Sequence, residues 1–152
     1  MKVLKFKGDP IITEFAGDGL YRIAKTASCT VWTDVGVLRY IIHAGFITDM
    51  RSGSHAIDWI IPKFTKDNDY NWAILIHDAN YTLDKDGNHN LNRETADLLL
   101  REMMRVSKTL NALQRFLMYN ALRLFGNSAY KSENIGVYAG IENYMSFRWD
   151  AK

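Results

Sequence analysis

The hydrophobic pattern changes from strand-like to helix-like part-way along the chain, and this change constrains the fold more than any other feature. Up to about Thr48 the apolar residues occur in brief runs, broken by turn residues such as the Gly-Asp-Gly segment at 17–19. Runs of this kind predict short strands. After about Asp69 the apolar residues recur every three or four positions, which is the spacing of one helix face. We therefore expect strands at 2–7, 21–24, 29–32 and 37–42, and helices at 71–82, 93–107 and 109–125.

This order of elements predicts an α+β fold, with short N-terminal antiparallel strands packed on a three-helix C-terminal part that contains an antiparallel helix pair. The chain has 152 residues, which suits one domain because domains cluster near about 100–150 residues. We expect a strand-rich part at 1–48, a helical part at 70–126 and an aromatic tail at 134–152. The periodicity leaves the secondary structure of the tail open. Asn92 is expected to cap the second helix, because its side-chain oxygen can accept a hydrogen bond from a free backbone amide.

Composition excludes several classes of protein. With 47% hydrophobic and 24% charged residues, the sequence is typical of a globular protein and not of a disordered one. Lysine and arginine number 19 against 17 acidic residues, so the charge indicates no nucleic-acid partner. The single cysteine, Cys29, cannot form a disulfide within the chain, which suits a reducing compartment. No apolar run is long enough to predict a transmembrane segment.

One predicted helix carries a histidine in a setting that suits acid–base chemistry. His77 follows an apolar triplet, and Tyr81, four residues later, shares its helix face. If the helix at 93–107 folds back antiparallel, Asp97 reaches a similar depth and can accept a hydrogen bond from one imidazole nitrogen. Such a bond fixes the tautomer and raises the basicity of the other nitrogen, as the activation of water requires. His77, Asp97 and Tyr81 are therefore the candidate catalytic residues.

The same three residues also have a structural interpretation. Half-buried histidines beside an acid often serve only to fix the packing of their helix. Tyr81 is then a packing aromatic whose hydroxyl finds a local partner. The residues alone leave both interpretations open.

Two aspartates are candidate ligands of a cation. Asp78 points away from His77 by helix geometry, and Asp49 lies in a segment at 45–55 that is rich in Gly, Ser and Thr. Carboxylate, hydroxyl and carbonyl oxygens suit calcium, whereas zinc prefers thiolates or paired histidines, which this segment lacks. One alternative is that the segment only turns the chain. Another is that Arg51 or Arg93 neutralises the two carboxylates in a structural ion pair.

The last predicted helix combines apolar and basic residues. Its leucines recur at three and four positions and predict one apolar stripe, made of Leu110, Leu113, Leu117, Ala121 and Leu124. Basic residues interleave with the apolar ones on the second and third helices. We interpret them as the solvated face of amphipathic helices and not as a nucleic-acid stripe: Arg101, Arg105, Lys108, Arg115 and Arg123.

Four motifs in this order resemble those of a known family. The chain contains Gly-Phe-Ile-Thr-Asp at 45–49, His-Asp-Ala-Asn-Tyr at 77–81, Arg-Glu-Thr-Ala-Asp at 93–97, and Met-Tyr-Asn-Ala-Leu-Arg-Leu-Phe-Gly at 118–126. They resemble a family of small tailed-phage and prophage proteins known as domain of unknown function 1353. The sequence differs at 52–54, where the family commonly has a Ser-x-Pro turn. The resemblance implies a phage origin and implies no activity.

A more distant similarity is to phospholipase A2, whose H-D-x-x-Y helix carries a catalytic histidine and a calcium-binding aspartate. It implies His77 as base, Asp78 as calcium ligand, Tyr81 as supporting hydroxyl and Asp97 as the acid that orients the histidine. The framing cysteines and the glycine-rich calcium loop of phospholipase A2 are absent from this sequence. The similarity is therefore an analogy, which places a site and assigns no substrate.

Two functions compete at this point. The first is a His/Asp hydrolase that acts on an ester or amide, with a lipid or peptide as substrate and calcium as a possible cofactor. The second is a non-enzymatic phage protein, either a virion or tail accessory or a factor that binds a host protein in takeover or anti-defence. In either case we expect the protein in the host bacterial cytoplasm or in the virion.

Overall fold

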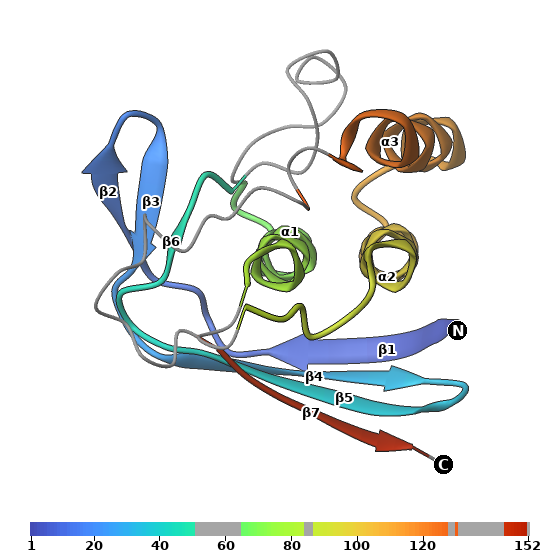
Figure 1. Ribbon diagram of the computed structural model, residues 1–152, viewed down its shortest axis with the longest axis horizontal. Coiled ribbons are helices and arrows are strands. Elements are labelled where there is room, and N and C mark those ends of the chain that lie inside the picture. Colours follow the sequence, from blue (N-terminus) through green and yellow to red (C-terminus); the bar gives the residue numbers. More distant parts are fainter. Residues whose placement is uncertain (51–64, 84–86, 128–129, 131–144, 152) are drawn as a thin grey trace.

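The computed structural model describes residues 1–50, 65–83, 87–127, 130 and 145–151 (Figure 1). Short antiparallel strands come first and helices follow, which confirms the predicted α+β class. The elements of the described part are β1 (Val3–Gly8), β2 (Thr13–Gly17), β3 (Leu20–Ile23), β4 (Ala27–Thr33), β5 (Gly36–Ile42), β6 (Ile47–Thr48), α1 (Asn68–Tyr81), α2 (Arg93–Ser107), α3 (Ala112–Phe125) and β7 (Met145–Ala151).

The strands form two antiparallel sheets. The larger sheet has the order β1-β4-β5-β7, and the smaller one has the order β2-β3-β6. In Figure 1, α1 and α2 lie over one face of the larger sheet, and α3 lies on the far side of α2 from that sheet. The sheet therefore has one face against the helices.

Alternation along β5 explains how the larger sheet divides its residues between its faces. Leu38, Tyr40 and Ile42 are buried, whereas Arg39 and Ile41 between them are exposed. Because successive side chains of a strand point to opposite faces, this pattern turns the apolar set toward the helices.

The predicted turn at 17–19 joins β2 and β3 into a hairpin. Gly17, Asp18 and Gly19 all have positive φ angles, of 91°, 51° and 75°. Glycine and aspartate tolerate this left-handed region better than most residues, so the sequence fits the turn.

The C-terminal tail, whose secondary structure the periodicity leaves open, supplies the strand β7. It pairs antiparallel with β5, from Ile42 opposite Met145 to Gly36 opposite Ala151. The ring of Phe147 lies 5.1 Å from that of Tyr40, measured between centroids. The remainder of the predicted tail, 134–144, lies outside the described residues.

Helix α1 is buried on nearly all sides, which explains why its sequence shows no clean apolar stripe. Trp72 anchors it to the larger sheet, since the indole N–H donates to the backbone oxygen of Asp9 at 2.7 Å. Gly8 permits this contact, because a Cβ atom there would lie 2.1 Å from the indole nitrogen. This contact joins α1, the helix that carries His77, to the end of β1.

Helices α1 and α2 form the predicted antiparallel pair. The end of α1 meets the start of α2 through Tyr81 and Asp97, which are hydrogen bonded. At the opposite end, Thr109 beyond α2 donates to the N-cap residue of α1, Asp67, at 2.7 Å. Asn92 caps α2 as predicted, by accepting from the backbone N–H of Thr95.

The predicted apolar stripe of the last helix is wrong in part. Leu110 and Ala121 are buried, but Leu113, Leu117 and Leu124 are exposed. The face that α3 buries instead carries Met118, Ala121 and Leu122. Spacing identifies an apolar face, but α3 has apolar residues on two faces and its contact with α2 selects one of them. None of the helices in the described residues has the length and apolar character of a membrane span.

Candidate functional site

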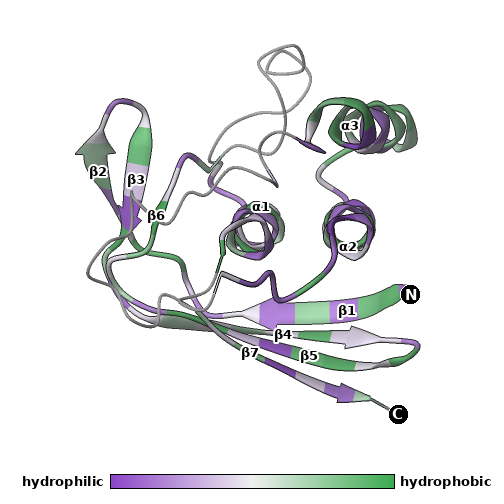
Figure 2. Ribbon diagram, viewed as in Figure 1, coloured by the Kyte–Doolittle hydropathy of each residue, from purple (hydrophilic) through white to green (hydrophobic). Residues whose placement is uncertain are grey.

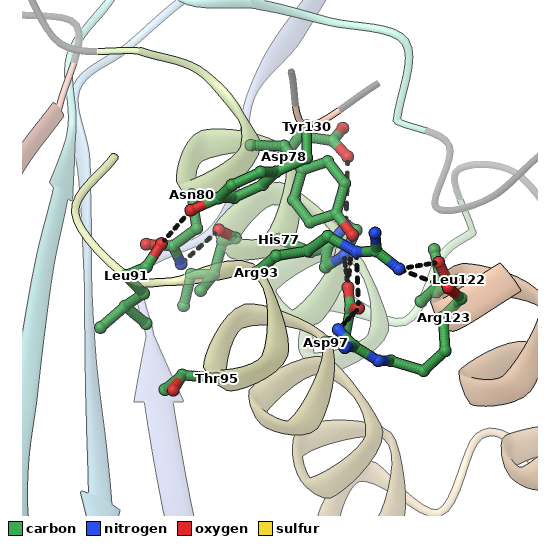
Figure 3. Close-up of polar contacts among 12 residues, drawn as sticks. His77, Asp78, Asn80, Leu91, Arg93, Thr95, Asp97, Leu122, Arg123 and Tyr130 are labelled. Carbon is green, nitrogen blue, oxygen red and sulfur yellow. Dashed lines mark hydrogen bonds and ion pairs between the residues drawn. The ribbon is translucent and has the colours of Figure 1, made fainter. Parts of the chain in front are cut away.

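The α1–α2 pair brings His77 and Asp97 into contact, as predicted. His77 Nε2 lies 3.1 Å from Asp97 Oδ1, and both side chains are buried (Figure 3). An ionised carboxylate can only accept hydrogen bonds, so Nε2 carries the proton that is donated to Asp97. This fixes the neutral tautomer in which Nδ1 is the basic nitrogen.

Tyr81 completes this contact from the last turn of α1. Its hydroxyl donates to Asp97 Oδ1, the same oxygen that accepts from His77. Its ring lies 4.2 Å from the imidazole of His77, which is four residues earlier on the same helix face. Tyr130 packs edge-on against Tyr81, with 5.2 Å between ring centroids. Tyr81 therefore holds Asp97 in place and packs against the imidazole.

Two arginines neutralise the other oxygen of Asp97. Arg123 Nη1 of α3 donates to Asp97 Oδ2 at 3.0 Å, and Arg93 Nε lies 3.7 Å from the same atom. Arg93 also donates to the backbone oxygens of Leu122 and Arg123 near the end of α3. Figure 3 shows Asp97 surrounded by these groups. Three helices therefore converge on one buried carboxylate.

Sequence analysis missed the role of Arg123, which was expected on a solvated face. Its side chain is 35% exposed, so its stem does reach the surface, but its guanidinium turns inward to Asp97. Helical periodicity places a residue on a face and does not show where a long side chain ends. The fourth motif contained a signal, because its arginine falls on this position.

Burial and charge shift the pKa values of the pair in opposite directions. Burial alone disfavours the ionised form of Asp97, but the hydrogen bonds from His77, Tyr81 and Arg123 and the charge of His77 outweigh it and lower the pKa of Asp97. Burial likewise opposes protonation of His77, but Asp78 and Asp97 outweigh it and raise the pKa of His77 above its ordinary value of 6.5. Asp97 is thus an anion beside an unusually basic imidazole.

Asp78 lies on the other side of the imidazole and joins α1 to the smaller sheet. Its Oδ1 is 3.9 Å from His77 Nδ1, and its Oδ2 accepts a hydrogen bond from the hydroxyl of Thr48 in β6. Burial is the main cause that raises the pKa of Asp78. His77 therefore lies between two carboxyl groups, one on each ring nitrogen.

The predicted cation ligands are only partly described. Asp49 is exposed and directly follows Thr48, the residue that contacts Asp78. Across the described ranges, no three or more His, Cys, Asp or Glu side chains group as a metal site would require. The rest of the predicted loop, 51–55, lies outside the described residues. Calcium binding by Asp78 and Asp49 stays a prediction.

Comparison with protein-family models identifies the family of this chain. The family model described as protein of unknown function, DUF1353, matches residues 26–122. The chain belongs to this family. The matched region spans the larger part of the chain and contains His77, Asp78, Tyr81, Arg93 and Asp97, whereas Arg123 lies one residue beyond it. Searches of curated proteins and of solved structures find no significant match.

The DUF1353 site can perform one kind of chemistry without further groups. A neutral imidazole with one nitrogen bonded to a buried carboxylate can take up a proton at the other nitrogen, because the carboxylate stabilises the imidazolium that forms. Arg123 helps to keep that carboxylate ionised, and both Arg123 and Arg93 pair with its Oδ2 atom. A general base with an orienting acid requires this geometry, and so does a buried polar network that only fixes the helices.

Proposed function

We propose that this DUF1353 chain is a small His/Asp hydrolase that uses His77 as general base on water. The observation that carries the proposal is the 3.1 Å hydrogen bond between His77 Nε2 and Asp97 Oδ1, which leaves Nδ1 as the basic nitrogen. In the proposed reaction a water beside Asp78, whose Oδ1 lies 3.9 Å from Nδ1, gives a proton to Nδ1, and the resulting hydroxide attacks an ester or amide carbonyl. The protonated His77 then returns this proton to the leaving alkoxide or amine, so that an acid and an alcohol or amine are released.

The surrounding residues have defined parts in this proposal. Asp97 orients His77 and stabilises its protonated form, and Tyr81 holds Asp97. Arg93 and Arg123 hold Asp97 in place through its other carboxylate oxygen, Oδ2. The substrate class is an ester or amide of a lipid or a peptide, and the setting that the family resemblance suggests is a phage protein in the host cytoplasm or the virion.

Burial favours a second candidate function. The side chain of His77 is 3% exposed and that of Asp97 is 0% exposed. In a non-enzymatic phage protein, a virion accessory or a host-protein binder, the same residues would form a polar network that fixes three helices. An experiment has to separate catalysis from this structural role.

The His77→Asn variant separates the two functions. For the hydrolase we expect the rate on p-nitrophenyl acetate, butyrate or palmitate, or on a peptide p-nitroanilide, to fall by about 10²–10⁴-fold, since a general base contributes about this factor. The fold should be largely retained, because asparagine keeps a polar group of similar size. For the structural role, urea denaturation should instead show a loss of about 1–3 kcal/mol, from a buried partner left unsatisfied.

His43→Asn is the matched control, since His43 is half-buried at the end of β5 and contacts Ser146 away from the α1–α2 pair. It should keep the wild-type rate. Equal rates for wild type and His77→Asn on every substrate hydrolysed would contradict the proposal and indicate a contaminating hydrolase.

Calcium is predicted to bind through Asp78 and Asp49. Asp78 accepts a hydrogen bond from Thr48, which Asp49 directly follows, and a divalent cation would favour the ionised form of Asp78, which burial disfavours. Calorimetry with calcium chloride should give heat with the wild type and much less with Asp78→Asn, and magnesium serves as the control ion. Absence of heat at millimolar calcium would leave the His77–Asp97 pair as a metal-independent base.

A further inference from the structure

Thr48, the threonine of the Gly-Phe-Ile-Thr-Asp motif, is a buried residue that reaches the candidate site from the smaller sheet. It is 3% exposed, and its hydroxyl donates a hydrogen bond to Asp78 Oδ2. Thr48 lies in β6 and Asp78 in α1, 30 positions apart in the sequence. Figure 2 shows hydrophilic residues on α1, which is buried on nearly all sides, and buried polar side chains require hydrogen-bond partners. Thr48 supplies such a partner to Asp78.

The Thr48 hydroxyl is held in one orientation by its own segment. Its oxygen accepts a hydrogen bond from the backbone N–H of Met50 at 2.9 Å, so its proton points away from that amide and toward Asp78. The backbone of Thr48 pairs with Tyr21 of β3. Met50 is fully buried and has a φ angle of 49°, which methionine adopts only where its surroundings hold it. Thr48 is therefore a fixed donor.

Asp78 requires a fixed donor if its carboxylate is to keep one orientation. The terminal torsion of an aspartate side chain has broad preferences, unlike the staggered torsions of saturated carbons. A hydrogen bond to Oδ2 sets the plane of the carboxylate, and this plane determines where Oδ1 lies. In the structure Oδ1 lies 3.9 Å from His77 Nδ1, the basic nitrogen of the candidate site.

The separation of these two atoms suits one bridging water. A distance of 3.9 Å is too long for a direct hydrogen bond, but a water can bond to both atoms at about 2.8 Å each. Such a water donates one hydrogen to Nδ1 and the other to Oδ1, and its oxygen keeps its lone pairs for attack. The side chain of Asp78 is 14% exposed, against 3% for His77, so the Nδ1 side of the imidazole is the side nearer to solvent.

We propose that Thr48 is a positioning residue of the hydrolase, whose hydroxyl orients Asp78 so that Asp78 holds the attacking water beside His77 Nδ1. The inference rests on the proposed function, because a non-enzymatic protein requires no such water. In the reaction the water gives one proton to Nδ1, and its oxygen forms the new bond to the carbonyl carbon. The proton then passes from Nδ1 to the leaving oxygen or nitrogen as that bond breaks. Thr48 and Asp78 are unchanged at the end.

Thr48→Val tests this role, because it removes the hydroxyl and nearly keeps the shape of the side chain. On the p-nitrophenyl ester or p-nitroanilide that the wild type hydrolyses, kcat should fall by roughly 10–100-fold, since a misplacement of about 1 Å can cost about 10²-fold. KM should stay unchanged, because Thr48 acts through Asp78 and not on the substrate. Thr48→Ser keeps the hydroxyl and should restore most of the wild-type kcat. All rates are measured at one calcium concentration and related to the folded protein by circular dichroism.

Thr33→Val is the matched control. Thr33 is 1% exposed, and its hydroxyl accepts from the backbone N–H two residues later, at Val35, as that of Thr48 does from Met50. It donates to the backbone oxygen of Gly36, at the turn between β4 and β5. Thr33→Val should lose stability in urea, as Thr48→Val does, but should keep the wild-type kcat. Equal effects of the two variants on kcat, or a Thr48→Ser chain as slow as Thr48→Val, would overturn the positioning role.

Two comparisons separate this role from the proposed function. A wild-type rate in His77→Asn contradicts the hydrolase, and the role of Thr48 with it. A slow His77→Asn together with a wild-type rate in Thr48→Val contradicts the role of Thr48 alone.

A double-mutant cycle in urea tests the contact without any substrate. Because Thr48 and Asp78 share one hydrogen bond, Thr48→Val combined with Asp78→Asn should lose less stability than the sum of the two single losses. Additive losses would overturn the proposal, since Thr48 would then not act through Asp78.

Discussion

Asp97→Asn is expected to lower the free energy of unfolding by about 3 kcal/mol, because breaking a buried ion pair by removing one partner costs about 3–5 kcal/mol. The carboxylate is fully buried and balances Arg93 and Arg123. In Asp97→Asn the two arginines lose their anion. The amide N–H group of the asparagine would also face groups that donate to Asp97 in the wild type, such as Tyr81 and Arg123. The lower end of the range applies because Arg123 is one-third exposed and can regain water.

The pH dependence of this loss has a definite sign. The pKa of Asp97 is lowered from its ordinary value of 3.8, so its stabilising effect is present above that pH and is lost as the pH falls through the lower folded-state value. The difference in the free energy of unfolding between wild type and Asp97→Asn, measured by urea denaturation, should therefore shrink in acid.

Glu94→Gln is the matched control. It removes an exposed carboxylate from the same helix and should lower the free energy of unfolding by less than about 1 kcal/mol. Equal losses for both variants would contradict the central position of Asp97.

Trp72→Ala is expected to cost about 3–5 kcal/mol, as large-to-small changes of buried aromatic residues do. Trp72 is fully buried, and its indole donates to Asp9 and packs under Gly8. Its loss would leave a cavity between α1 and the larger sheet and release the helix that carries His77. Trp32→Ala is the matched control, because Trp32 is only half-buried and lies beside Lys5. A loss no larger than that of Trp32→Ala, by urea denaturation, would show that Trp72 does not anchor α1.

The contact between His77 and Asp97 could be predicted because it depends on local geometry. Helical spacing places His77 and Tyr81 on one face, and a short connection returns α2 antiparallel, so that Asp97 falls opposite them. The N-cap at Asn92 follows from its own side chain in the same way. Such features depend on residues within a few helical turns, which the sequence order itself brings together.

Other features depend on contacts between distant segments, and the sequence pattern could not provide them. β7 becomes a strand because β5, more than a hundred residues earlier, offers it an edge. The buried face of α3 is selected by α2, and this left Leu113 and Leu124 exposed against expectation. Arg123 reaches Asp97 because α3 packs beside α2, whereas periodicity alone placed it in solvent. Each depends on tertiary packing, which overrides local preference.

The pH dependence of hydrolysis tests the role of His77 most directly. The pKa of His77 is raised above 6.5, and only its neutral form can act as base, so the rate should rise with pH to a plateau, with a midpoint above 6.5. Over the same window the stability contributed by protonated His77, fully present below about pH 6.5, should be lost. A rate that rises with this midpoint in the wild type and loses the pH-dependent limb in His77→Asn is the predicted result. A rate independent of pH, or the same limb in the variant, would contradict His77 as the general base.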